Sequence, residues 1–186
     1  MFARQLSMVT IRAAGDGDLD VVRTLLREYA TYLNESVGEE HICLGNYEKE
    51  LITLPAPYHS PGGVILLAMV GDEPGGVIAL KPLTPLRSVF PGERACEMKR
   101  LWVRPQYRGL RLGKLLSEGL IEQARARDYT AMYLDTMPGT MQAANHIYVE
   151  LGFAPLERYG DNPVLRPQQG SEDNRSPDVV FFRREL

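Results

Sequence analysis

The stretch at residues 96–120, CEMKRLWVRPQYRGLRLGKLLSEGL, holds the pattern that decides the fold. Residues 95–103 predict a β-strand that stops before Pro105, and the apolar residues of 112–127 recur at helical spacing. Between them lies a short basic turn that contains Gly109. Such a turn either only reverses the chain or binds a phosphate group, because the free N–H groups of a helix's first turn attract anions.

Composition favours one globular domain that spans residues 1–186. The chain is 44% hydrophobic and 24% charged, and its net charge of −3 gives no overall sign of nucleic-acid or membrane binding. Two cysteines and three histidines stand apart in the sequence, so neither a disulfide framework nor a metal site is expected. No stretch approaches the run of about 20 apolar residues that a membrane span needs, and the start of the chain lacks the apolar core of a signal peptide. The expected localisation is therefore cytoplasmic.

The order of the predicted elements indicates a mixed α/β domain. Strands are predicted over residues 8–13, 64–70, 76–80, 95–103, 131–135 and 179–183, and helices over 19–33, 46–54, 112–127 and 141–151. The second and third strands are expected to form a hairpin across the turn at residues 71–75. Because a helix separates strand 95–103 from strand 131–135, these two strands should be adjacent and parallel.

Two well-known phosphate-binding loops do not fit the basic turn. The loop of nucleotide triphosphatases requires four residues between its glycines and a Ser or Thr after its lysine. Here three residues separate Gly109 from Gly113, and Leu115 follows Lys114. The three-glycine pattern of dinucleotide-binding proteins fails as well.

The turn does resemble motif A of the GNAT superfamily, the acetyl-CoA-dependent N-acetyltransferases. That motif reads [Q/R]-x-x-G-x-[G/A] and is similar to QYRGL at residues 106–110, with Arg111 in the last position. The family's second signature, A-x-x-L-Y-x-x-x-G-F, resembles ANHIYVELGF at residues 144–153. The resemblance covers most of the chain in element order, and its specific residues lie between 97 and 153. It implies a single-domain GNAT fold with a mixed, mainly antiparallel sheet flanked by helices.

The resemblance also implies acetyl-CoA as the acetyl donor, without a metal. In this family the backbone of motif A holds the pyrophosphate group, and a free N–H group of the preceding strand polarises the thioester carbonyl. The implied cofactor-binding residues are Leu101, Trp102, Val103, Arg108, Gly109, Leu110, Arg111, Leu112, Gly113 and Lys114. The alternatives are a plain strand-to-helix turn with solvated basic side chains and an ordinary paired strand.

The acceptor amine must lose a proton, and Glu97 lies where some members of the family carry a catalytic glutamate. The side chains of Glu97 and Lys99 share one face of an alternating strand, so a local salt bridge between them is the alternative. His59, Glu93 and Asp135 are weaker candidates for the base.

Tyr148 resembles the tyrosine that serves this family as the acid for the departing thiolate. The alternative is a core aromatic residue on the apolar face of its helix. Many members of the family have Asn seven residues earlier, where this chain has Met141. Trp102 is expected to pack against a helix, and His146 to be exposed.

The resemblance therefore predicts an enzyme that moves an acetyl group to a primary amine by direct attack. The acceptor, a small molecule or a peptide amine, is not specified by fold and cofactor motif. Its site is expected to involve the first two helices, the loop at residues 58–59 and the segment at 159–162. Neither nucleic acid nor a membrane is an expected partner, and a homodimer is left open. The alternative is a non-catalytic acyl-CoA sensor or regulatory module with the same fold, which Arg111 and Met141 favour.

Overall fold

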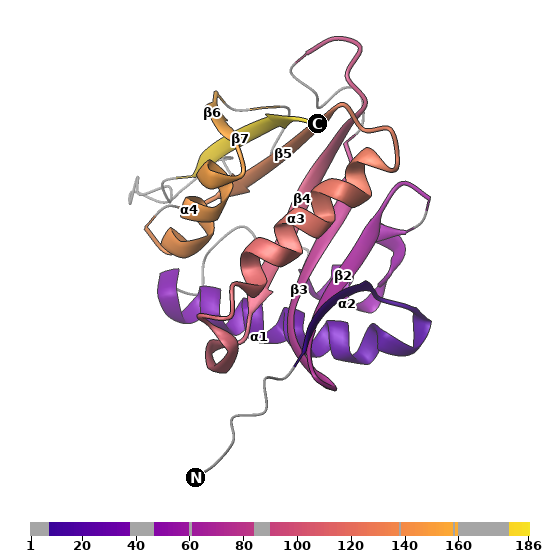
Figure 1. Cartoon of the computed structure of the whole chain (residues 1–186), viewed down its shortest axis with the longest axis vertical. Coiled ribbons are helices and arrows are strands. Elements are labelled where there is room, and N and C mark those ends of the chain that lie inside the picture. Colours follow the sequence, from indigo (N-terminus) through magenta and orange to yellow (C-terminus); the bar gives the residue numbers. More distant parts are fainter. Residues whose placement is uncertain are drawn as a thin grey trace, which may run out of the picture.

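The computed structural model describes residues 8–37, 47–59, 61–83, 90–137, 139–157, 159 and 179–186. Within these ranges the elements follow one another in the order β1, α1, α2, β2, β3, β4, α3, β5, α4, β6 and β7. Figure 1 shows one twisted sheet with α3 crossing in front of it and α1 behind it. The architecture is α/β, as the sequence predicts.

The strands of the described residues form one seven-stranded sheet in the order β1-β2-β3-β4-β5-β7-β6. Their bounds are Val9–Ala13 (β1), Val64–Val70 (β2), Glu73–Pro82 (β3), Ala95–Val103 (β4), Ala131–Thr136 (β5), Ala154–Leu156 (β6) and Val180–Glu185 (β7). All neighbours are antiparallel except β4 and β5, which run parallel across the connection through α3. The predicted mainly antiparallel sheet and the predicted parallel pair are both confirmed.

The helices bury their apolar stripes against opposite faces of the sheet. Their bounds are Leu19–Val37 (α1), Tyr47–Ile52 (α2), Leu112–Arg125 (α3) and Gln142–Glu150 (α4). Leu116 of α3 packs in one core cluster with Ile78, whereas Leu25 of α1 packs in another with Val77. Because successive strand residues point to opposite faces, Val77 and Ile78 serve the two cores of one sheet.

Two expected boundaries are corrected. The hairpin turn is shorter than residues 71–75, because β3 already begins at Glu73. Gly71 has a φ of 63°, which lets the chain reverse within two residues. The helix that starts at Leu112 ends at Arg125 rather than at residue 127, since the chain turns there toward Asp128, whose φ is 58°.

The parallel ladder between β4 and β5 covers only the first residues of each strand. It ends at the pair Glu97–Tyr133, although β4 continues to Val103 and β5 to Thr136. A β-bulge against β3 lies in the same segment, where Arg100 takes a φ of 62°. The two strands therefore part beyond Glu97, and the edge of β4 that faces β5 has no ladder partner there.

Candidate active site

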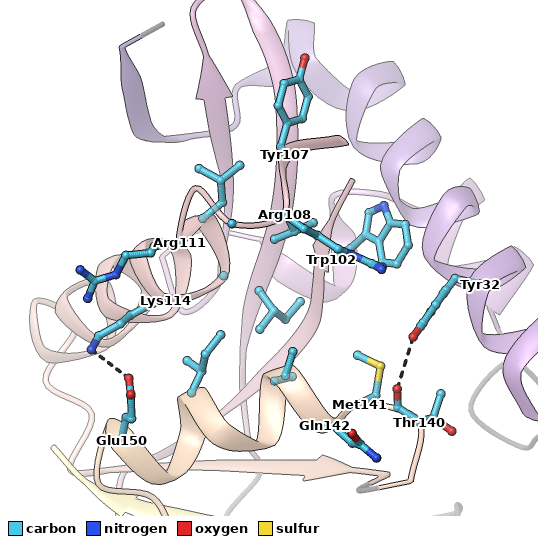
Figure 2. Close-up of a pocket in the computed structure, with 18 of the residues that line it drawn as sticks. Tyr32, Trp102, Tyr107, Arg108, Arg111, Lys114, Thr140, Met141, Gln142 and Glu150 are labelled. Atoms are coloured by element: carbon cyan, nitrogen blue, oxygen red, sulfur yellow. Dashed lines mark hydrogen bonds and ion pairs between the residues drawn. The ribbon is translucent and has the colours of Figure 1, made fainter. Parts of the chain in front are cut away.

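A cavity of about 870 Å³ lies beyond the point where β4 and β5 part, and Figure 2 shows the side chains around it. The lining consists of Tyr32, residues 101–103, 107–109, 111–114 and 139–144, Ile147 and Glu150. Its volume is in the range of small-molecule and cofactor sites. All the predicted cofactor-binding residues except Leu110 line this cavity, and the side chain of Leu110 is exposed.

The turn before α3 offers a row of free backbone donors at the rim of the cavity. Within the described residues, the N–H groups of Gly109 and of residues 111–114 donate to no hydrogen-bond acceptor. Gly109 has a φ of 91° and Arg111 a φ of 59°, so both residues take left-handed conformations that turn the chain into the helix. The helix dipole adds partial positive charge at the same place. This arrangement fits the phosphate groups of a ligand.

The basic side chains of the turn point in different directions. The Arg108 guanidinium lies over the rings of Tyr32 and Trp102, 5.4 and 5.6 Å from their centroids. The ammonium group of Lys114 lies 3.0 Å from the carboxylate of Glu150 on α4. In Figure 2 the side chain of Arg111 extends on the same side as Lys114, away from Trp102. Arg111 therefore does not fill the space beneath the free N–H groups.

The wall opposite the turn comes from α1 and from the loop before α4. The hydroxyl of Tyr32 donates a hydrogen bond of 3.3 Å to the carbonyl of Thr140. Met141 lines the cavity beside Thr140, just before α4, and Glu150 lines it at the last residue of that helix. The motifs do not include Tyr32 or Thr140, and Glu150 stands at an unspecified position of the second signature. Tyr32 follows Leu25 by seven residues and Tyr29 by three, and only this helical spacing indicates that it shares the inward face of α1.

The end of β4 is fixed by α1. The indole of Trp102 donates to Glu28 at 3.2 Å and packs against Tyr29 and Tyr32. Arg104 makes hydrogen bonds of 2.7–3.1 Å with the same carboxylate. These contacts confirm that Trp102 packs against a helix, and they hold residues 101–103 against the cavity.

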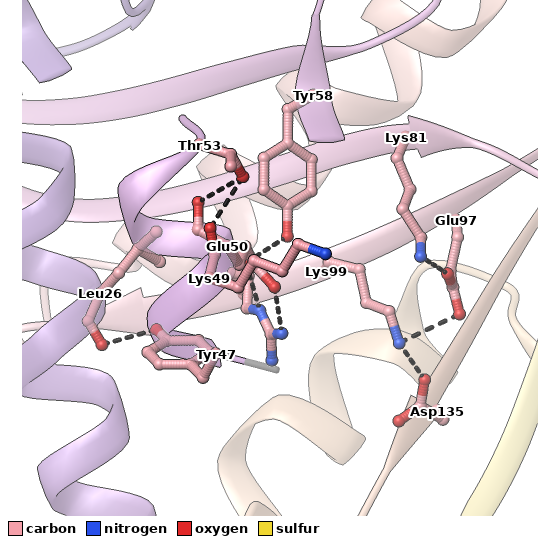
Figure 3. Close-up of polar contacts among 11 residues, drawn as sticks. Leu26, Tyr47, Lys49, Glu50, Thr53, Tyr58, Lys81, Glu97, Lys99 and Asp135 are labelled. Carbon is pink, nitrogen blue, oxygen red and sulfur yellow. Dashed lines mark hydrogen bonds and ion pairs between the residues drawn. The ribbon is translucent and has the colours of Figure 1, made fainter. Parts of the chain in front are cut away.

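The carboxylate of Glu97 lies in a buried ionic cluster that Figure 3 displays. The ammonium groups of Lys99 and Lys81 lie 3.0 and 3.1 Å from its two oxygens, and the hydroxyl of Tyr159 donates to it at 2.7 Å. Burial alone would raise the pKa of Glu97, but the two lysines and the Tyr159 hydrogen bond outweigh it and lower the pKa to about 2. The salt bridge with Lys99 is thus present, and so low a pKa makes Glu97 a weak proton acceptor.

Tyr148 of α4 is buried beside the rings of Phe153 and Phe182. Its hydroxyl forms no hydrogen bond within the described part of the chain. Burial raises the pKa of this phenol, and the charge of Asp135 acts in the same direction. Tyr148 therefore packs as a core aromatic residue, and at neutral pH it also holds a proton that no neighbour accepts.

The weaker candidates lie apart from one another. His59 is exposed, and Glu93 accepts hydrogen bonds from Tyr133 and Arg183 at the closed end of the β4–β5 ladder. Asp135 accepts a hydrogen bond of 2.5 Å from Lys99. Residues 161 and 162 lie outside the described residues. The side chain of His146 is 77% exposed, as expected.

The described residues contain neither a helix that could span a membrane nor a cluster that could bind a metal ion. None of their helices is long and apolar enough to cross a membrane. Across the same residues, no group of three or more His, Cys, Asp or Glu side chains is placed to hold a metal ion.

Comparison with known proteins identifies relatives over most of the chain. The family described as Acetyltransferase (GNAT) family matches residues 22–153. An uncharacterized N-acetyltransferase of Schizosaccharomyces pombe is 34% identical over 169 residues, which cover 91% of this chain and 89% of that protein.

Solved structures share the fold at lower identity. A GNAT-family acetyltransferase of Staphylococcus aureus superposes with a TM-score of 0.67 at 20% identity, over 96% of this chain and 99% of that one. The PaiA N-acetyltransferase of Thermoplasma acidophilum, solved in complex with coenzyme A, gives a TM-score of 0.67 at 15% identity over 96% and 99% of the two chains. At these identities the likeness concerns the fold.

Proposed function

This chain belongs to the acetyltransferase (GNAT) family, a family of acyl transfer, and on that premise we propose that it moves an acetyl group from acetyl-CoA to a primary amine by direct attack. The observation that carries the proposal is the cavity where β4 and β5 part. Its rim carries free N–H groups, and α4, which contributes Ala144 and Ile147 to its lining, also carries the buried Tyr148.

The residues of the cavity fit coenzyme A. The N–H groups of Gly109 and of residues 111–114 would hold the pyrophosphate, with Arg108 and Lys114 adding positive charge. Leu101, Trp102 and Val103 would line the pantetheine chain and offer a backbone N–H group to the acetyl oxygen. The bound cofactor supplies the acyl group as a thioester. The protein supplies position and a polar environment, which account for much of the rate in such reactions.

Proton transfer divides between a donor and an acceptor. The hydroxyl of Tyr148, which keeps its proton at neutral pH, would give that proton to the departing thiolate, although its raised pKa makes it a weaker acid than a solvent-exposed phenol. Glu97, the base that the resemblance implies, is less suited to remove the amine proton, because its pKa of about 2 leaves little driving force. We therefore assign Glu97 to the ionic cluster and propose that water in the open cavity takes the amine proton and passes it to the solvent.

The sensor alternative draws on Arg111 and Met141. The side chain of Arg111 extends on the side of Lys114, and both residues line the cavity, so Arg111 stands beside the free N–H groups. Met141 gives the cavity an apolar group where an amide is common in the family.

Thiol release separates the two functions. The protein would be mixed with acetyl-CoA and a library of primary amines, and free coenzyme A would be followed with a thiol reagent. We expect amine-dependent release that requires no added metal. Saturable acetyl-CoA binding without release for any amine would support the sensor instead.

A further inference from the structure

Beyond the end of the backbone ladder, β4 and β5 still contact each other through an ion pair between side chains. The ladder ends at Glu97–Tyr133, and two residues further on each strand come Lys99 and Asp135. Since alternate strand residues share a face, Lys99 stands on the face of Glu97 and Asp135 on the face of Tyr133. The Lys99 ammonium and the Asp135 carboxylate lie 2.5 Å apart across the point where the strands part (Figure 3).

We propose that the Lys99–Asp135 ion pair is a positioning device that spans the gap where β4 and β5 part at the bulge, fixes its width and so sets the opening of the cavity. Backbone hydrogen bonds bring neighbouring strands to about 4.8 Å, whereas a bridge made of two side-chain tips accepts a wider separation. The bridge lies between the last ladder pair and residues 101–103, which line the cavity. Closing the ladder by two more residues would bury the edge of β4 that faces the site.

The surroundings hold the bridge in one geometry. Lys99 also contacts Glu97 at 3.0 Å, and Glu97 is held from its other side by Lys81 and by the Tyr159 hydroxyl. The side chains of Lys99 and Asp135 are only 19% and 10% exposed. A buried ion pair contributes little net stability compared with apolar side chains of similar size, so stability alone is a weak reason for its presence.

The test replaces both charges at once. In the variant Lys99→Val/Asp135→Val the net charge is kept, and two short side chains that favour strands allow the ladder to extend. The matched control is Glu93→Val/Arg183→Val, which removes a pair with 10% and 24% exposed side chains beside strands that are already paired. Circular dichroism would verify the fold of each variant.

Two measurements then report on the opening. Without ligand, hydrogen exchange of the amides at residues 98–103 and 134–136 is expected to slow about two- to tenfold in the Lys99/Asp135 variant, as new ladder hydrogen bonds form, and to stay unchanged in the control. In calorimetry, the same variant is expected to bind coenzyme A about tenfold more weakly. A change of this size is typical when two groups in contact are replaced. The control is expected to bind like the wild type.

Unchanged exchange at both segments would overturn the proposal and reduce the pair to a structural ion pair. The proposal rests on the proposed function only in its choice of coenzyme A as the ligand. If the folded wild type does not bind coenzyme A, the proposed function fails. Hydrogen exchange then still tests the ion pair without any ligand. If the double variant does not fold, the isosteric Asp135→Asn weakens the bridge while keeping its shape. Asp135→Asn should slow hydrogen exchange in the same segments to a smaller degree. Exchange rates equal to those of the wild type would contradict the proposed role of the ion pair.

Discussion

At the scale of single residues, burial acts on two ionisable groups with opposite results. The Tyr148 phenol has no cation within hydrogen-bonding distance, and its burial raises the pKa. The Glu97 carboxylate is as deeply buried, but Lys81 and Lys99 lower its pKa to about 2. At neutral pH the tyrosine therefore keeps its proton and the glutamate does not, so only Tyr148 can act as an acid.

Replacing Tyr148 by Phe removes the hydroxyl and keeps the ring packing. We expect kcat to fall about 100-fold or more, the usual contribution of a general acid, with little change in coenzyme A affinity. Steady-state kinetics and calorimetry would measure the two effects. Tyr129→Phe is the control, because its hydroxyl donates to the Gly62 carbonyl away from the cavity and kcat should not change. Equal kcat values for both variants and the wild type would make Tyr148 structural only.

The Glu97 cluster predicts a pH dependence of stability. The folded pKa of about 2 lies below the ordinary value of 4.5, so the ionised carboxylate stabilises the fold above pH 4.5, and this contribution is lost as pH falls toward 2. Glu97→Gln should lower the free energy of unfolding by about 3–5 kcal/mol at pH 7, because both lysines lose a partner. In urea titrations the difference from wild type should shrink below pH 4.5. A difference that stays constant down to pH 3 would contradict the assigned ionisation.

Arg111 occupies a left-handed conformation that costs a residue with a side chain about 1–2 kcal/mol, whereas glycine adopts it freely. Arg111→Gly should leave the free energy of unfolding unchanged or raise it by up to about 1 kcal/mol. Asp128→Gly is the matched control, since its φ of 58° is the same and it lies beyond the far end of α3. Both variants should gain similar stability in thermal melts.

Coenzyme A affinity then distinguishes the two glycine variants. Arg111→Gly should weaken binding by about 1–3 kcal/mol if its guanidinium binds a phosphate, and Asp128→Gly should not change it. A large gain in affinity for Arg111→Gly would show that Arg111 obstructs the site.

At the scale of elements, β4 and the residue that follows it contact three neighbours through basic side chains. Lys99–Asp135 joins β4 to β5, Arg100–Glu50 joins it to α2, and Arg104–Glu28 joins the residue after β4 to α1. The alternation of residues 95–103 predicts the strand itself. This alternation does not predict the bulge at Arg100, because the residues before and after a single inserted residue still look like those of a regular strand. The residue pattern therefore predicted the strand, whereas its separation from β5 was expected only from the family resemblance, which implies a free N–H group there.

Helices α3 and α4 approach each other closely beside the cavity, and Gly113 sits at this contact. A Cβ atom at Gly113 would lie 3.1 Å from the tip of Ile147 on α4, whereas at Gly119 of the same helix it would lie 3.3 Å from Ile11 of β1. Both Gly→Ala variants gain helix propensity of up to about 1 kcal/mol, against a similar steric cost. We expect calorimetry to find weaker coenzyme A binding for Gly113→Ala only. Equal loss in both variants would indicate a general effect on α3.

At the scale of the whole molecule, the cofactor motifs were readable because they are continuous in sequence. Residues 106–114 run without a break from a 3-10 helix through the basic turn into the start of α3, and the predicted cofactor-binding residues among them, except Leu110, line the cavity. The opposite wall was not readable, since Tyr32 and Thr140 meet across 108 residues of sequence. The same holds for Glu97, whose partner Tyr159 lies 62 residues away. The local alternation predicts its contact with Lys99, but not the contacts with Lys81 and Tyr159, which also lower its pKa.

We propose above all that the opening between β4 and β5 binds coenzyme A through the backbone of the turn before α3. Calorimetry of wild type, Arg108→Ala and Gly109→Pro with coenzyme A, without added metal, tests it most directly. Gly109 has a free N–H group and a φ of 91°, and proline removes the donor and requires a φ near −65°. We predict binding by the wild type, modest weakening by Arg108→Ala, and loss of about 1.5–3 kcal/mol or more for Gly109→Pro, the value of a hydrogen bond to a charged group. Wild-type affinity in folded Gly109→Pro, or no binding by the folded wild type, would contradict the claim.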